Sequence, residues 1–154
     1  MSEIRDSSNQ PIYSTGGVGF RSNAPYKRIV AKAGTNVLTG GTEHLDKSVI
    51  TQLVSQVVEL HQQGVQVIIV TSGAVASGRQ LLDQVHQGKR DEPSRQVQAA
   101  VGQSRLMHAY EVGFDLHGVT TAQALVSRGD LDGRMGYLNV RNTLLELLDL
   151  RVVP

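Results

Sequence analysis

The sequence contains no cysteine, and this absence excludes several kinds of site at once. A protein without cysteine has no disulfide framework, no thiolate zinc finger and no thiol nucleophile. Basic residues (15) nearly balance acidic ones (14), and no basic cluster is interleaved with aromatic residues, so we expect no nucleic-acid partner. No apolar run is long enough to span a bilayer or to serve as a secretory signal. We therefore expect a cytoplasmic protein that makes no contact with membranes.

The length of 154 residues limits the chain to one domain or part of one. Residues 1–27 are polar, contain three glycines and two prolines, and show neither the helical nor the strand period. We interpret this segment as a flexible leader. Regular structure is expected only over residues 28–154.

The first half of that region has the pattern of a strand, a helix and a second strand. Residues 28–32 form a short apolar run, residues 46–63 carry apolar side chains at helical spacing, and Gly64 follows as a stop. Residues 65–70 are continuously apolar, which is typical of a parallel strand covered on both faces. A helical crossover between two strands predicts that the strands are parallel.

The second half predicts three more helices and two more strands. A helix over residues 74–85 is followed by a charged loop at 87–93 and by a long helix that starts near Pro93 and ends near His117, with Gly118 as its left-handed cap. Residues 119–126 read as a third strand, 134–149 as a leucine-rich helix, and 151–154 as the start of a fourth strand. The inward face of the long helix is predicted to include Val97, Ala100, Val101, Leu106 and Phe114.

The candidate chemistry lies where the first two strands end. Lys32 closes the first strand directly before a Gly-Thr-Asn turn, which would hold an ammonium group beside backbone donors and suits a phosphate. The second strand runs into Thr71-Ser72-Gly73-Ala74 and then a helix start, where an anionic ligand group is favoured. Ser72 there can cap the helix or offer its hydroxyl outward. The plain alternatives are a solvated lysine and a structural turn.

Other familiar sites are not supported. The five histidines lack the spacing of a helical zinc site, and Asp130-Leu131-Asp132-Gly133 lacks the remaining ligands of a calcium loop. Neither the Walker pattern nor the dinucleotide glycine fingerprint is present. We assign no residue to a metal.

Four blocks together resemble the glutamate 5-kinases, a branch of the amino acid kinase family. They are KAGTNVLT (residues 32–39), VTSGAVASG (70–78), AAVGQSRLM (99–107) and YLNVRNTL (137–144). The resemblance covers residues 27–154 and implies the amino-terminal part of an amino acid kinase domain. The implied fold is a truncated α/β, three-layer α/β/α sandwich with a mostly parallel sheet.

The resemblance also implies a function and a set of site residues. ATP, with Mg2+, would phosphorylate the γ-carboxylate of L-glutamate to glutamyl 5-phosphate, the first step of proline biosynthesis. Lys32 would contact the transferring phosphoryl group as the catalytic residue, and the nucleotide site would comprise Lys32, Gly34, Thr35 and Asn36. Ser72, Gly73 and Ala74 would hold glutamate. No residue can be assigned to magnesium, and a homo-oligomer is implied for the complete enzyme.

Two hypotheses remain open from the sequence. One is that the chain is the amino-terminal part of a working glutamate 5-kinase, and the other is a non-catalytic module that keeps the glutamate-side fold for assembly or sensing. The family continues after the Val152-Val153-Pro154 block with an Asn/Asp-rich loop and most of the nucleotide site. We therefore expect residues 1–154 alone to be inactive.

Overall fold

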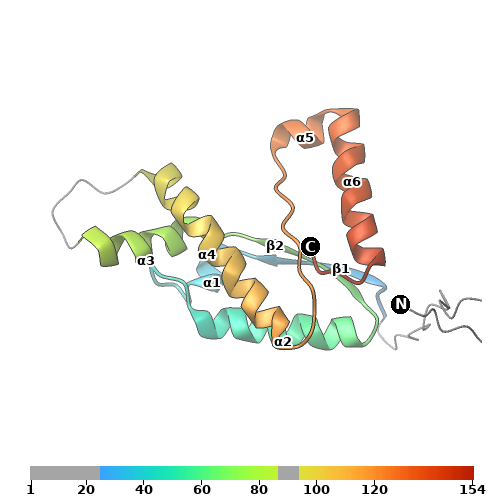
Figure 1. Ribbon diagram of the computed structural model, residues 1–154, viewed down its shortest axis with the longest axis horizontal. Coiled ribbons are helices and arrows are strands. Elements are labelled where there is room, and N and C mark those ends of the chain that lie inside the picture. Colours follow the sequence, from blue (N-terminus) through green and yellow to red (C-terminus); the bar gives the residue numbers. More distant parts are fainter. Residues whose placement is uncertain (1–24, 87–93) are drawn as a thin grey trace, which may run out of the picture.

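A computed structural model of the chain describes residues 25–86 and 94–154 (Figure 1). Most of the predicted leader and the whole predicted loop at 87–93 lie outside these residues. The described elements are β1 (Arg28–Ala33), α1 (Thr35–Leu38), α2 (Lys47–Gln62), β2 (Gln66–Thr71), α3 (Ala74–His86), α4 (Arg95–Asp115), α5 (Arg128–Asp132) and α6 (Arg134–Asp149). Among the described residues, no helix has the length and apolar character needed to cross a bilayer.

Strands β1 and β2 form a parallel pair, as the strand–helix–strand pattern predicted. Helix α2 connects them, and its local signals are clear. The Asp46 carboxylate accepts a hydrogen bond from the Ser48 amide at the first turn, and Gly64 adopts a φ of 86° after the last turn. The first is an N-terminal cap and the second a C-terminal glycine stop. Both are common at helix ends, because the terminal amides and carbonyls lack partners within the helix.

The hydrophobic core lies on one face of this strand pair. Ala33, Val65 and Val67 meet buried residues of α2 and α4 there. On the opposite face, Val30 is 60% and Val70 is 47% exposed. Figure 1 shows α2 running along one side of the strands while α5 and α6 rise on the other. The prediction that β2 is covered on both faces is therefore wrong for the described residues, because an apolar run permits burial but does not provide the covering layer.

The predicted third strand is reduced to one bridge. Thr121 pairs in parallel with Val153, and the Val153 amide donates to Thr120 O at 2.9 Å. The amide of Ile69 donates to Pro154 O at 2.9 Å, so residues 152–154 lie between β2 and residues 120–122. A strand requires a neighbouring ladder along its length, and residues 123–126 have none in the described structure.

Helix α4 begins after Ser94, whose hydroxyl accepts a hydrogen bond from the Val97 amide. Its inward face agrees only in part with the predicted one: Leu106 and Phe114 are buried as expected. Its buried residues follow a spacing of four: Gln98, Gly102, Leu106, Tyr110 and Phe114. Val97 is 48% exposed and Ala100 is also exposed, so their predicted inward placement is wrong. The physical reason is a close backbone approach at the glycines, which orients the helix more strongly than its weak apolar periodicity does.

That approach joins α4 to α3. A Cβ added at Gly102 would lie 1.8 Å from the carbonyl oxygen of Ala74, and one added at Gly78 would lie 1.8 Å from the carbonyl oxygen of Gln98. The two helix backbones are therefore in contact, which only glycine permits. The first turn of α3, directly after Ser72 and Gly73, rests against α4.

Candidate functional site

The two predicted turns meet at one edge of the strand pair. The parallel register pairs Ala33 with Thr71, so Gly34 and Ser72 leave their strands at the same level. The amide of Ser72 donates to Ala33 O at 3.0 Å, which joins the second turn to the end of β1. Ligand sites in open parallel sheets lie at the carboxyl ends of the strands, and this is such an edge.

The hydroxyl groups of Thr35 and Ser72 contact each other. Their oxygens lie 3.0 Å apart, although the two residues are 37 positions apart in the sequence. The Ser72 hydroxyl also donates to Ala33 O at 3.2 Å. The residue expected in the phosphate turn and the residue expected to hold glutamate are thus direct neighbours.

Lys32 is exposed and stands opposite Val70 in the register. Strand alternation places its side chain on the open face of the pair, with Val30. No hydrogen bond between the Lys32 ammonium and the Thr35 or Ser72 hydroxyl occurs within the described residues. The structure therefore places Lys32 near the strand end that precedes Thr35 but does not join it to the hydroxyl pair.

Gly34 and Asn36 form the turn between β1 and the single-turn helix α1. The carbonyl of Gly34 accepts from the amides of Val37 and Leu38, both at 3.1 Å, and the carbonyl of Asn36 accepts from Gly41. A Cβ added at Gly34 would meet nothing within 4 Å. The backbone at Gly34 is therefore open to an approaching group, which is compatible with a phosphate of ATP.

Gly73 and Ala74 turn the chain from β2 into α3. Gly73 has a φ of 105°, and a Cβ there would lie 3.1 Å from Leu45 Cδ2 and 3.2 Å from Leu38 Cδ1. The backbone conformation favours glycine, and the space for a side chain is tight. Its carbonyl accepts the amide of Ser77 at 2.9 Å in the first turn of α3. The Ser72 hydroxyl, in contrast, is directed at Ala33 and Thr35, so its bonds tie the two turns together.

Sequence reasoning missed two residues behind this site, Thr71 and Tyr110. The oxygens of their hydroxyl groups lie 2.9 Å apart, and the Thr71 hydroxyl also donates to Ser72 O at 3.1 Å. Burial raises the pKa of the Tyr110 phenol, against a smaller opposite effect of the Thr71 hydrogen bond. A signal existed in the sequence: Tyr110 lies on the stripe of Gly102, Leu106 and Phe114 at a spacing of four, and a buried tyrosine hydroxyl needs a partner.

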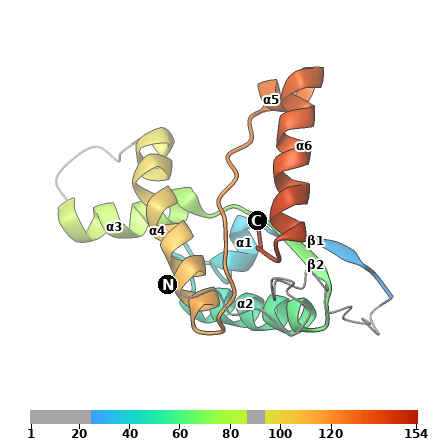
Figure 2. The ribbon, with the colours of Figure 1, turned by 45° about the vertical axis from the view of Figure 1, so that its right-hand side comes forward.

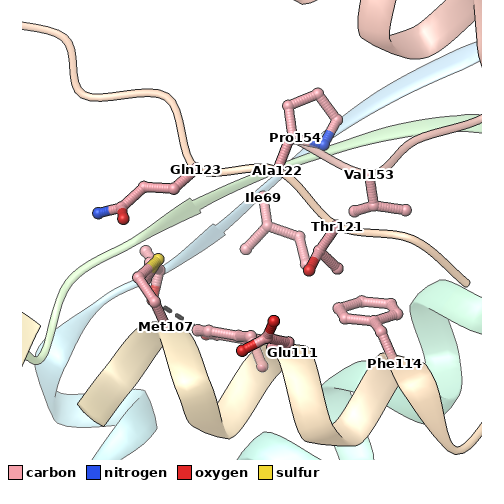
Figure 3. Close-up of a pocket in the computed structure, with 11 residues that line it drawn as sticks. Ile69, Met107, Glu111, Phe114, Thr121, Ala122, Gln123, Val153 and Pro154 are labelled. Carbon is pink, nitrogen blue, oxygen red and sulfur yellow. Dashed lines mark hydrogen bonds between the residues drawn. The ribbon is translucent and has the colours of Figure 1, made fainter. Parts of the chain in front are cut away.

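A cavity of about 250 Å3 opens beside this pair, between β2, α4 and the segment of residues 121–123 (Figure 3). Glu111 and Gln123 line it together with apolar groups that include Met107, Phe114 and Ile69. The cavity shares Thr71 and Tyr110 with the hydroxyl network. None of the residues predicted to bind ATP or glutamate lines it.

A larger groove of about 760 Å3 runs between α2, α3 and α4. Its lining is mixed, with Lys47, Arg105 and His108 beside apolar residues such as Ile50. None of the predicted site residues contributes to it. A group of three or more acidic or histidine side chains able to hold a metal ion is also not found in the part of the chain that the structure describes.

The sequence is similar to known proteins over most of its length. The amino acid kinase family matches residues 27–154. Glutamate 5-kinase of Dehalococcoides mccartyi is 51% identical over 128 residues, which are 83% of this chain and 34% of the relative. The glutamate 5-kinase of Chlorobaculum tepidum is 46% identical over 84% of this chain and 36% of its own length. That of Escherichia coli O1:K1 is 44% identical over 82% and 34%.

Among solved structures, carbamate kinase from Giardia lamblia bound to citric acid is similar over 70% of this chain and 39% of the carbamate kinase chain. The sequence identity is 20% and the TM-score is 0.47. The chain thus spans about a third of the length of the curated relatives that it matches.

Proposed function

The chain belongs to the amino acid kinase family, and from this premise we propose that it forms part of a glutamate 5-kinase. The proposed reaction is the ATP-dependent phosphorylation of the γ-carboxylate of L-glutamate to glutamyl 5-phosphate, the first step of proline biosynthesis, in the cytoplasm. Relatives of that name share 44% to 51% of their residues with this chain over the matched region. The non-catalytic alternative has no comparable support.

The observation that carries the proposal is the 3.0 Å contact between Thr35 Oγ1 and Ser72 Oγ. Phosphoryl transfer requires that the donor phosphate and the acceptor carboxylate meet in line, although both are anionic. If the first turn binds phosphate and the second binds glutamate, this contact sets the two substrates next to each other. The open backbone at Gly34 leaves room for the phosphate.

Each proposed residue then has a physical task. ATP supplies the phosphoryl group. The ammonium of Lys32 offsets the negative charge shared between donor and acceptor oxygens, and because it makes no hydrogen bond to the two hydroxyls in the described structure, it stays available for a substrate. Ser72 offers hydrogen bonding to glutamate, and Gly73 and Ala74 present the backbone at the start of α3. No described residue is assigned to magnesium, and homo-oligomerisation stays a prediction.

The test is Lys32→Ala in the full-length protein, with Lys47→Ala as a matched control on the exposed start of α2. We expect turnover to fall about 100-fold or more, while the glutamate KM changes less than about threefold, because the lost charge acts mainly in the transition state. The acyl phosphate is trapped with hydroxylamine to measure the rate. An unchanged turnover with only a raised glutamate requirement would contradict the role given to Lys32.

A further inference from the structure

We propose that Tyr110 and Thr71 are positioning residues for glutamate binding, acting through Ser72. A continuous series of hydroxyl groups runs from Tyr110 on α4 through Thr71 at the end of β2 to the Ser72 backbone, and the Ser72 side chain continues to Thr35. This inference rests on the proposed function, because it concerns the same site. It adds two residues that are not expected to touch either substrate.

The directions of the hydrogen bonds follow from counting protons. The Thr71 hydroxyl has one proton, and it donates this proton to Ser72 O at 3.1 Å. The Tyr110 hydroxyl must therefore be the donor to Thr71 Oγ1, at 2.9 Å. The phenol is protonated at neutral pH in any case, and burial raises the pKa of Tyr110 further.

Ser72 is held on both sides by these bonds. Its amide and its hydroxyl donate to Ala33 O, at 3.0 and 3.2 Å, and its carbonyl accepts from Thr71. The backbone of Ser72 is therefore held at its amide by the end of β1 and at its carbonyl by the Thr71 side chain. Loss of the Thr71 bond would free the carbonyl and allow the exposed turn to rotate.

Tyr110 is a suitable fixed point for such a series. It is only 6% exposed and lies one helical turn from both Leu106 and Phe114, which are fully buried. The helix that carries it is locked against α3 by the backbone contacts at Gly78 and Gly102. An exposed binding turn is thus connected to a rigid part of the core, which is the arrangement that precise binding sites need.

A simpler role is that the two hydroxyls only satisfy each other in the core. The two roles differ in a double variant. Thr71→Val removes the Thr71 partner of the buried Tyr110 hydroxyl, and Tyr110→Phe removes the donor to Thr71 Oγ1, which keeps its own bond to Ser72 O. Either change destabilises the fold, whereas replacing both hydroxyls with apolar groups of the same shape restores much of the stability. The double variant would nevertheless lack the bond that positions Ser72.

The experiment compares Tyr110→Phe, Thr71→Val and the double variant in the full-length protein, with Tyr26→Phe as a hydroxyl deletion at an exposed site. Glutamate affinity is measured by calorimetry, and stability by thermal melting. We expect each single variant to raise the glutamate Kd about five- to tenfold. The double variant should show a similar increase, not the product of the two, because both changes break the same connection.

The decisive result is a double variant that melts closer to wild type than either single variant but still binds glutamate weakly. Turnover at saturating glutamate should fall less than about threefold. Unchanged glutamate affinity in Tyr110→Phe, or affinity that recovers together with stability in the double variant, would overturn the inference alone. Absence of glutamate binding by the wild-type protein would overturn the proposed function as well.

Discussion

Helices α4 and α6 are both long, and apolar periodicity is weaker in α4 than in α6, yet α4 is the one that packs into the core. Helix α4 buries Gln98, Gly102, Leu106, Tyr110 and Phe114, whereas α6 buries only Leu148. Figure 2 shows α4 lying across the region of α2 and α3, while α6 rises away from it with α5 at its far end. Amphipathic spacing therefore predicts that a helix forms, but not that its apolar face is covered.

The two regions are also attached by different physical means. The α3–α4 pair is joined by backbone contacts that glycine permits, next to a buried apolar cluster. The base of α6 carries the buried Leu148 and two polar contacts to the strand pair and α2: Gln66 Nε2 donates to Asp149 Oδ1 at 3.2 Å, and His61 Nε2 lies 3.0 Å from Arg151 O. The contact between α3 and α4 depends on the packing of the core, whereas the contacts of the α6 base include the ionisable ring of His61.

The largest expected difference comes from removing a leucine in each region. Leu106 is 1% exposed in α4, and Leu131 is 53% exposed in α5. Leu106→Ala should lower the free energy of unfolding by about 2–5 kcal/mol, through lost burial and the cavity left behind. Leu131→Ala should change it by about 0.5 kcal/mol or less. Denaturant titrations measure both, and equal effects would remove the distinction between the regions.

A smaller difference is expected from one methyl group added at a glycine. At Gly102, a Cβ meets Ala74 O at 1.8 Å, and at Gly136 it meets Asp130 O at 2.5 Å. Gly102→Ala should cost about 1–3 kcal/mol, because α3 and α4 must separate. Gly136→Ala should shift only the short α5 and leave the melting temperature nearly unchanged. A cooperative loss of stability from Gly136→Ala would show that the α5–α6 region belongs to the same folding unit as the core.

The smallest effect is predicted at His61, where the two regions meet. Burial lowers the pKa of His61 below its ordinary value of 6.5, and the nearby Arg151 charge acts in the same direction, against the hydrogen bond to Arg151 O. The folded state therefore prefers the neutral ring. This contribution to stability is present above pH 6.5 and is lost as the pH falls through the lowered pKa.

The corresponding measurement follows the free energy of unfolding from about pH 8 to about pH 5. His61→Gln keeps a donor for Arg151 O and removes the titration, so its curve should be flatter over this range than that of wild type. His117→Gln, at an exposed histidine, serves as the control and should follow wild type. Identical slopes for His61→Gln and wild type would contradict the assigned role of His61.

Local signals predicted much of the fold. The bounds expected for β1, α2 and β2 differ from the observed ones by one residue, because helix caps, glycine stops and apolar runs act over a few neighbouring residues. The prediction of a third strand was wrong because strand pairing depends on distant residues. Residues 119–126 have a strand composition, but pairing depends on residues 152–154, far along the chain. The predicted inward placement of Val97 was wrong for a similar reason, since the contact of α4 with α3 decides which side of α4 points to the core.

The residues of the candidate site also fall into two groups, those that the sequence could indicate and those that only the structure connects. Lys32 and Ser72 could be selected from the sequence because each stands where a strand meets a turn, whereas Gly34 and Thr35 were selected through the resemblance to the glutamate 5-kinases. Thr71 and Tyr110 could not be connected, since their hydroxyls meet across 39 positions of sequence. Their roles, like those of the predicted residues, remain proposals to be tested by the variants above.

By itself, the sequence determined the parallel strand–helix–strand unit, the two turns that follow β1 and β2, and membership of a kinase family. These features depend on backbone propensity and side-chain periodicity, which are properties of short segments. Only the tertiary structure decided which face of the strands is covered, which stripe of α4 points inward, and which hydroxyls touch. Those outcomes depend on distances between segments that the chain brings together only when it packs.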